Sequence, residues 1–206
     1  MLLGITSVII GYLLGSFPAA YIIARYKKGI DIREVGVRNM GGANVIREVG
    51  KRAGALALVF DIGKGAASVY IAQVLGVSTP WVLAAGFAAM LGHNYPVYIG
   101  FRGGKGVSTV MGIFFVLSPL AMAGTTAVIG IFLLFTRSFF VAVELTTPFF
   151  LLLVWYVEGV GAIFYCAAAI VAFQLFRSRG RLKEVKAIIN RWRGRDKGAI
   201  AKVKEC

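Results

Sequence analysis

Several windows of the chain are long, apolar and almost free of charge, which suits a lipid environment better than a soluble fold. Hydrophobic residues make up 58% of the 206 residues and charged residues only 16%, whereas a soluble domain has about half and about a quarter. A helix needs roughly 20 apolar residues to cross about 30 Å of hydrocarbon. The apolar windows cover residues 2–24, 53–75, 80–101, 107–117, 120–135, 139–156 and 160–176. The sequence therefore predicts an all-α, polytopic membrane protein with seven transmembrane helices, one of them short.

The basic residues divide the connections between these windows into two classes. Of the 23 Lys and Arg, eight lie in 25–52, two in 102–106, one at 137 and eleven in 177–204. The connections 76–79, 118–119 and 157–159 contain none. Because cytoplasmic loops carry the excess of Lys and Arg, we expect the N-terminus outside and the C-terminus in the cytoplasm. We also expect one integral membrane domain over 1–176, with a cytoplasmic loop at 25–52, and a basic cytoplasmic tail at 177–206.

The window 107–117 is too short to span the membrane by itself. Its 11 residues extend only about 17 Å as a helix. Joining it to 120–135 would leave six crossings and place the basic tail outside, against the charge distribution. The loop before this helix must therefore begin below the membrane surface, inside protein. We expect Gly103, Gly104, Lys105 and Gly106 to lie in a recessed site that opens to the cytoplasm.

Nucleic-acid binding and metal or covalent catalysis do not fit this sequence. A net charge of +14 would suit a nucleic acid, but the chain spends its length on apolar windows and not on a water-facing basic surface. One histidine and two cysteines, Cys166 and Cys206, offer neither a metal-ligand spacing nor a covalent catalytic pair. We expect no nucleic-acid partner, no metal and no cofactor.

A glycine- and asparagine-rich segment at 36–47 contains the groups that bind anions. Glycines let backbone N–H groups converge, asparagine amides add neutral donors, and arginine binds phosphate through two parallel hydrogen bonds. The candidates are Asn39, Gly41, Asn44 and Arg47, with Arg38 as a secondary candidate. The same composition also suits a flexible connector between two helices.

A second polar segment joins the window that contains His93 to the glycine-rich turn 103–106. Glycines before a helix N-terminus form an anion site, and Lys105 would add a full positive charge there. Three roles are open to His93: general base, donor to a phosphate, or bridge to the backbone. The turn lacks the residues of a nucleotide-binding P-loop, and its alternative reading is a tight turn with a lysine that reaches toward the surface. Further candidate ligands are Gly103, Gly104, Gly106 and Thr109, with Ser108 as a secondary candidate.

Charged and polar side chains inside the windows mark the remaining candidates, since such groups are costly in lipid unless they are paired or functional. Asp61 and Lys64 lie three residues apart, on one face of a helix. Either Lys64 adds a second cation to a phosphate while Asp61 orients it, or the two neutralise each other. Glu144 must be protonated, paired or turned toward a cavity. Ser16, close to a proline in the first window, is a secondary candidate.

In their order along the chain, these residues resemble the bacterial membrane acyl-phosphate:glycerol-3-phosphate acyltransferases, the PlsY family. The resemblance covers most of the chain, at 15–21, 44–51 and 60–65, and is most specific at Leu91-Gly92-His93 and at Gly103-Gly104-Lys105-Gly106-Val107. It implies transfer of a fatty acyl group from acyl phosphate to the 1-hydroxyl of glycerol 3-phosphate, which gives lysophosphatidate and phosphate for phospholipid biosynthesis. It also implies a cytoplasmic active site in the bacterial inner membrane, with His93 and Lys105 as catalytic residues. The implied partners are acyl phosphate, glycerol 3-phosphate and membrane lipids.

The chain departs from the family pattern in two places. Four residues differ from the family's Gly-Ser-Gly-Asn-x-Gly-Ala-Thr-Asn loop, and two differ after the last window, where the family has His and Asn: Val37, Arg38, Gly42, Ala43, Ser178 and Arg181. The alternatives to acyl transfer to glycerol 3-phosphate are therefore a paralogue with another acceptor and a non-catalytic phosphate or lipid binder. A carrier of organic phosphates fits less well, because connections of two to four residues leave no outer gate.

Overall fold

The protein is all-helical in a computed structural model that describes residues 1–178. Four segments are long and apolar enough to cross a membrane, namely Leu2–Lys28, Lys51–Val74, Pro119–Thr136 and Phe139–Glu158. Within the described range there is no β-strand, so the predicted helical class is confirmed. The elements are α1 (Leu2–Ser16), α2 (Ala19–Lys28), α3 (Gly42–Glu48), α4 (Lys51–Val74), α5 (Thr79–Asn94), the 3-10 turn η1 (Val97–Ile99), α6 (Val107–Leu117), α7 (Pro119–Thr136), α8 (Phe139–Glu158) and α9 (Ala162–Ser178).

Proline and glycine set the helix ends that matter for the site. The first apolar window is divided at Phe17 and Pro18, between α1 and α2. The window 80–101 is helical only as far as Asn94, because Pro96 has no backbone N–H and disfavours a helical conformation at the residue before it. Helix α6 begins after Gly106, whose φ of 81° is left-handed, and covers the predicted short window 107–117.

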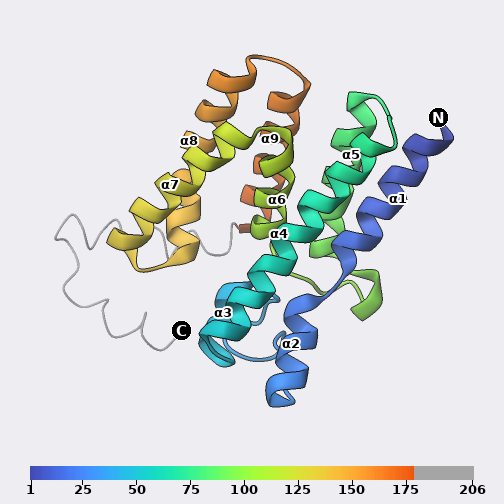
Figure 1. The fold of residues 1–206 in the computed structure, drawn as a ribbon. Coiled ribbons are helices and arrows are strands. Elements are labelled where there is room, and N and C mark those ends of the chain that lie inside the picture. The colour runs from blue at the N-terminus through green and yellow to red at the C-terminus, as the bar shows by residue number, and fades with distance from the viewer. Residues whose placement is uncertain (179–206) are drawn as a thin grey trace.

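Helices α1 and α5, and likewise α4 and α6, pack backbone against backbone through glycines. A Cβ added at Gly15 would meet the carbonyl oxygen of Ala89, and one added at Gly65 would meet that of Thr109. Gly112 faces the carbonyl oxygen of Ile62 in the same way. Small residues allow this close approach, which is typical of helices packed within a membrane. In Figure 1, α1 and α5 lie on one side of the molecule and α7 and α8 on the other, with α6 and α9 between them.

A smaller apolar cluster holds α2, α3 and the loop between them against the start of α4. Its fully buried members include Ala24, Ile32, Met40 and Val45. Both short helices lie at the end of the molecule away from the N-terminus (Figure 1). The segment at 29–41 therefore has an apolar core of its own, which fixes its position against α2, α3 and α4.

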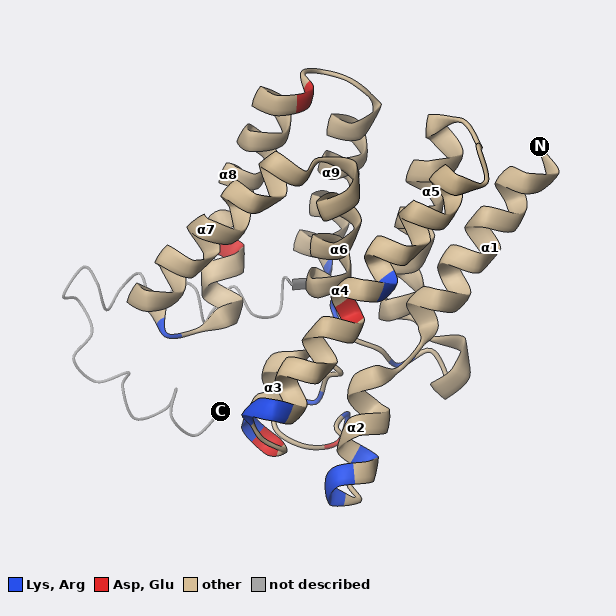
Figure 2. Ribbon diagram, viewed as in Figure 1, with Lys and Arg blue, Asp and Glu red and all other residues tan. Residues whose placement is uncertain are grey.

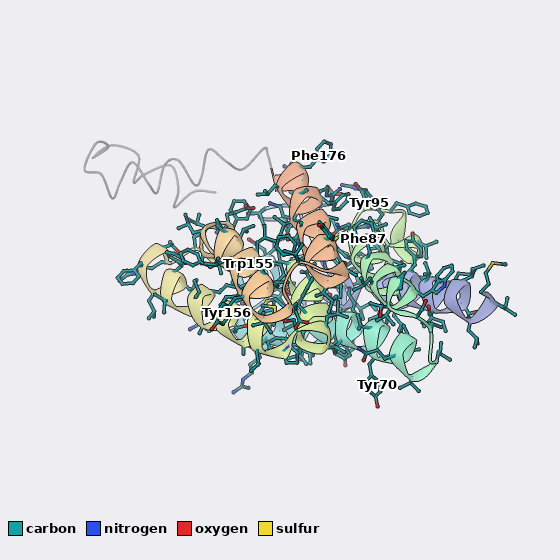
Figure 3. The ribbon with its side chains drawn as sticks, turned by 90° about the horizontal axis from the view of Figure 1, so that it is seen from above. Tyr70, Phe87, Tyr95, Trp155, Tyr156 and Phe176 are labelled. Atoms are coloured by element: carbon teal, nitrogen blue, oxygen red, sulfur yellow. The ribbon has the colours of Figure 1, made fainter. Side chains whose placement is uncertain are left out.

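Charge and exposed aromatic side chains are distributed as in a membrane protein. Figure 2 shows Lys and Arg gathered around α2, α3 and the start of α4, at one end of the molecule. Tyr70, Trp155 and Tyr156 are exposed and lie on the outside of the helices, whereas Phe87 and Tyr95 lie beside α9 (Figure 3). Outward-facing apolar and aromatic side chains of this kind suit contact with lipid.

Candidate active site

An open cavity lies between the 36–44 loop and helices α4, α6, α8 and α9; its empty space is about 870 Å³, part of it open to the outside. Its polar wall comes from the loop, from Asp61 and His93, and from the start of α6. Its opposite wall is mostly apolar and belongs to α8 and α9. Seven of the predicted site residues line it: Asn39, Gly41, Asn44, Asp61, His93, Lys105 and Ser108.

Asp61 is the centre of a buried charged cluster. Its Oδ1 lies 2.8 Å from Lys64 Nζ and 3.3 Å from His93 Nδ1, and all three side chains are at most 8% exposed. Lys64 Nζ also donates to the backbone oxygen of Phe17 (3.0 Å), at the break between α1 and α2. Of the two arrangements open to Lys64, the structure shows the one in which it neutralises Asp61. Lys64 therefore supports the cavity wall and is not part of the lining.

The glycine turn is folded directly onto His93. The N–H of Gly104 donates to the backbone oxygen of His93 (3.1 Å), and that of Gly103 donates to the oxygen of Asn94 (3.2 Å). A side chain at residue 104 would collide with His93 Nε2. The glycine is needed here for close approach to the imidazole, which is held between Asp61 and the turn.

Arg177, near the end of α9, fixes the outer side of the same turn. Its guanidinium donates to the backbone oxygen of Gly104 (3.2 Å) and to the hydroxyl of Tyr95 (2.9 Å), and it stacks 4.8 Å above the Tyr95 ring. Tyr12 in turn donates to the backbone oxygen of Tyr95 (2.8 Å). The turn is thus connected to α1 and α9 as well as to α5.

Lys105 brings a buried cation to the cavity. Its Nζ lies 4.1 Å from the centre of the Phe140 ring, an arrangement that stabilises an ammonium group away from water. Ser108, the second residue of α6, lines the cavity, whereas Thr109 is fully buried and is not part of the lining. The cation and the hydroxyl at the start of α6 suit an anionic group.

The 36–44 loop owes its shape to Asn44. The amide of Asn44 donates to the backbone oxygens of Ile32, Val35 and Asn39, and its Oδ1 accepts from the N–H of Val37. These four bonds are all between 3.0 and 3.1 Å. The Asn44 side chain therefore stabilises the loop, whereas the sequence predicted it to bind phosphate. The Asn39 side chain accepts from the N–H of Gly41 (2.9 Å), and its amide nitrogen remains for a ligand.

An arginine clamp joins this loop to η1. Arg33 pairs with Asp31 (2.7 Å) and donates to the backbone oxygen of Ile99 (2.7 Å), and its guanidinium lies 4.9 Å from the centre of the Tyr21 ring. The hydrogen bonds from Arg33 keep the pKa of Asp31 below its ordinary value, despite partial burial. The 29–41 segment and η1, which are distant in sequence, are thus held together.

Several predicted residues lie outside the lining. Arg38 and Arg47 are exposed, and Ser16 donates to the backbone oxygen of Tyr12 (2.8 Å). Gly103, Gly104 and Gly106 shape the turn behind Lys105. In the described part of the chain, no group of three His, Cys, Asp or Glu is placed to hold a metal ion.

A second, largely apolar cavity lies beside the first, between α6, α7, α8 and α9; its empty space is about 410 Å³, part of it open to the outside. Thr147 and Gln174 line both cavities, and Glu144 lines the first. Glu144 is among the polar residues that the sequence marks as candidates, whereas Gln174 is not. A lone glutamine in an otherwise apolar window is the signal that points to it.

A site with one polar and one apolar compartment suits a ligand with an anionic head and a fatty tail. The sequence model of the glycerol-3-phosphate acyltransferase family matches residues 5–187. The chain belongs to this family. The resemblance seen in the motifs is therefore confirmed over most of the chain.

Individual members of the glycerol-3-phosphate acyltransferase family support this assignment. The chain is 36% identical over 183 residues to a glycerol-3-phosphate acyltransferase of Geotalea daltonii, covering 89% of this chain and 94% of that one. It is 45% identical over 123 residues to the enzyme of this name from Geobacter sulfurreducens (59% and 63% of the two chains). It is 46% identical over 115 residues to glycerol-3-phosphate acyltransferase 1 of Dehalococcoides mccartyi (55% of each). In these last two comparisons the chain spans between about half and two thirds of the relative's length.

Solved structures of the same family extend the likeness to the fold. The crystal structure of PlsY, an integral membrane glycerol 3-phosphate acyltransferase, in its glycerol 3-phosphate form has a TM-score of 0.81 to this chain. It is 32% identical and covers 97% of this chain and 98% of its own. The lysophosphatidic acid form has a TM-score of 0.79 at the same identity, over 94% and 93% of the chains. The integral membrane fold of this protein is thereby confirmed.

Two of the departures from the family loop lie on the cavity wall. Val37 and Ala43 line the cavity at positions where the family has Ser and Thr, so the wall lacks two hydroxyls. Arg38, at a family glycine, has a φ of 52°, which shows that the loop keeps a left-handed turn there. Ser178 ends α9, and Arg181 lies outside the described residues.

Proposed function

We propose that this protein transfers a fatty acyl group from acyl phosphate to the 1-hydroxyl of glycerol 3-phosphate, giving lysophosphatidate and inorganic phosphate. The observation that carries the proposal is the pair of neighbouring cavities with a shared wall, one with Lys105, Ser108 and Asn39, the other largely apolar. The phosphate of the donor fits the first cavity and its tail fits the second. Family membership supports the same reaction, as do the PlsY structures in their glycerol 3-phosphate and lysophosphatidic acid forms.

In this reaction the protein gathers two phosphates and supplies no nucleophile. Lys105 and the amide of Asn39 bind phosphate, and the backbone of the 36–44 loop adds donors, which offsets the repulsion between two anions in a low-dielectric pocket. Arg47, whose side chain is exposed on α3, attracts the anionic substrates to the mouth of the cavity. Lys64 contributes by neutralising Asp61, so that the Asp61 carboxylate does not repel the substrates.

Acyl phosphate is already activated, so the chemistry needs orientation and proton transfer. The 1-hydroxyl oxygen of glycerol 3-phosphate attacks the acyl carbonyl carbon. The bond between that carbon and the phosphate oxygen then breaks, and phosphate leaves. The hydroxyl proton passes to a phosphate oxygen or to His93, which lines the cavity and is oriented by Asp61.

We further propose seven membrane crossings, with the N-terminus outside and an active site that faces the cytoplasm of the bacterial cell. Helices α5, α6 and α9 are shorter than the four long spans, but they lie alongside them (Figure 1). Counting them gives one membrane domain over 1–176, with the cytoplasmic loop 25–52 and the basic tail 177–206. The gathering of basic residues at one end supports this orientation (Figure 2).

The direct test is product formation by the detergent-purified protein from palmitoyl phosphate and glycerol 3-phosphate, measured as lysophosphatidate and released phosphate. We expect turnover in the wild type and a loss of about 100-fold or more in kcat/KM for Lys105→Ala, because a buried donor to the reacting phosphate is removed. Lys27→Ala, an exposed lysine of α2, is the matched control and should match the wild type.

Three results would overturn parts of the proposal. Full turnover by well-folded Lys105→Ala would remove Lys105 from the site. Product formed only with another hydroxyl acceptor would change the substrate. Counterflow of labelled glycerol 3-phosphate in proteoliposomes without an acyl donor would indicate a carrier.

A further inference from the structure

Gln174 occupies a distinctive place between the two cavities. Five residues line both, and three of these are valines. The two polar ones are Thr147 and Gln174. Thr147 Oγ1 donates to the backbone oxygen of Val143 (3.1 Å), within its own helix. Gln174 is therefore the side chain at this junction that can still offer a donor.

The amide of Gln174 is buried with unused hydrogen-bonding capacity. Its Nε2 is inaccessible to solvent and has no hydrogen-bond partner among the described residues. Burying an amide donor without a partner costs free energy in a low-dielectric site. Because this amide makes no hydrogen bond in the unliganded protein, we expect it to meet a hydrogen-bond acceptor on the ligand.

The shape of an acyl phosphate determines which of its atoms reaches this junction. With the phosphate in the polar cavity and the tail in the apolar one, the group between them is the acyl carbonyl. We infer that Gln174 Nε2 donates a hydrogen bond to the carbonyl oxygen of the acyl donor, and so positions the carbonyl for attack and stabilises the charge that it gains. This inference rests on the proposed function and adds a residue to it.

The role follows from the electron flow in the reaction. As the glycerol 3-phosphate oxygen bonds to the carbonyl carbon, the carbonyl π electrons move onto oxygen, which becomes an oxyanion. The electrons return when the bond to the leaving phosphate breaks. A fixed donor at this oxygen stabilises the oxyanion more than the neutral carbonyl and thus lowers the barrier.

The test compares Gln174→Met with the wild type in the palmitoyl phosphate assay. Methionine keeps the length and flexibility of the side chain but cannot donate. We expect kcat/KM for palmitoyl phosphate to fall by about 10²- to 10³-fold, as for loss of one oxyanion donor, with the KM for glycerol 3-phosphate unchanged. Gln73→Met, on an exposed glutamine of α4, makes the same substitution away from both cavities and should behave as the wild type.

A carbonyl-free ligand separates this role from a merely structural one. Hexadecyl phosphate carries the same phosphate and a similar tail, so it should inhibit the wild type and Gln174→Met with equal inhibition constants. If inhibition weakens in parallel with turnover, Gln174 shapes the cavity and the inference is wrong. If Gln174→Met does not fold, Gln174→Leu serves instead, since leucine is of similar size, carries no charge and offers no donor. The same loss is expected for it.

The two proposals fail in different ways. A Gln174 variant with kcat/KM near that of an active wild type overturns the inference and leaves the acyltransferase function in place. A folded wild type that forms no lysophosphatidate overturns the function, and the inference with it.

Discussion

At the residue scale, the position of His93 depends on the absence of a side chain at Gly104. The imidazole is fixed on one side by Asp61 and on the other by the backbone of the turn. A methyl group at residue 104 would collide with Nε2, so either the ring or the turn must move. Either His93 or Lys105 would then leave its place on the cavity wall.

Gly104→Ala should therefore lower kcat by about 100-fold, the cost of a displacement of about 1 Å in a catalytic group. The assay is lysophosphatidate formation at saturating concentrations of both substrates. Gly161→Ala is the control, because a Cβ there meets nothing within 4 Å. A Gly104→Ala protein with the kcat of the control would show that the turn tolerates the extra methyl group.

The residues also show how far sequence reasoning reaches at this scale. The pairing of Asp61 with Lys64 could be predicted because i and i+3 share a helix face. The addition of His93 could not, since it requires α4 and α5 to pack side by side. Asn44 was assigned to phosphate binding from its type alone, and only the folded loop shows that its hydrogen bonds go to backbone groups.

At the scale of elements, α4 offers a matched pair of glycines. Gly65 packs against the backbone of α6, whereas a Cβ at Gly63 would meet nothing within 4 Å. Gly65→Ala should destabilise the protein by about 1–3 kcal/mol through overpacking. Gly63→Ala should be neutral or slightly stabilising, because alanine is the better helix former.

Thermal unfolding of the two purified variants in one detergent measures this difference. A lower Tm for Gly65→Ala alone is the expected result. Equal Tm values would show that α4 and α6 can separate without loss of stability, against the glycine-mediated packing described above.

The loop clamp formed by Asp31 and Arg33 should respond to acid. Because the pKa of Asp31 lies below 3.8 in the folded protein, and near 3.9 in an unfolded chain, its contribution is complete above about pH 4. The contribution is lost as pH falls through the lowered pKa. Hydrogen exchange of residues 30–41, corrected for intrinsic rates, should be slow from pH 7 to about pH 4 and accelerate below it.

Asp31→Asn provides the control for this behaviour. It lacks the ionised carboxylate at every pH, so its loop should exchange fast already at pH 7. Slow exchange in Asp31→Asn at pH 7 would mean that Arg33 holds the loop through Ile99 and Tyr21 alone.

Element boundaries were predictable where proline or glycine stands at the end. The short helix 107–117 was recognised with its limits, since Gly106 precedes it and Pro119 follows it closely. The predicted helical window 80–101 extends beyond the observed helix, which ends at Asn94, because the apolar sequence continues into the loop that follows. Hydropathy detects burial in lipid, and it cannot distinguish a helix from a buried turn that follows it.

At the scale of the whole molecule, the proposed seven crossings can be tested by cysteine accessibility. In a background with Cys166→Ser and Cys206→Ser, we expect Glu158→Cys to react with a membrane-impermeant maleimide added to intact spheroplasts. Lys51→Cys should react only after permeabilisation, since Lys51 begins α4, at the basic end of the molecule (Figure 2) that we propose faces the cytoplasm. The reverse pattern would invert the topology, and labelling of both from outside would remove a crossing.

The salt bridges of Asp61 also have a consequence for how this protein can change over time. A buried carboxylate that loses one cation is left with uncompensated charge, so single replacements of Asp61 or Lys64 are each harmful. Phe17 belongs to the same group, because the helix break beside Pro18 places its carbonyl where Lys64 can reach it. Asp61 and Lys64 should therefore vary together among descendants of this chain or not at all, and a lineage that abandons the charge pair no longer needs the helix break that presents the carbonyl of residue 17.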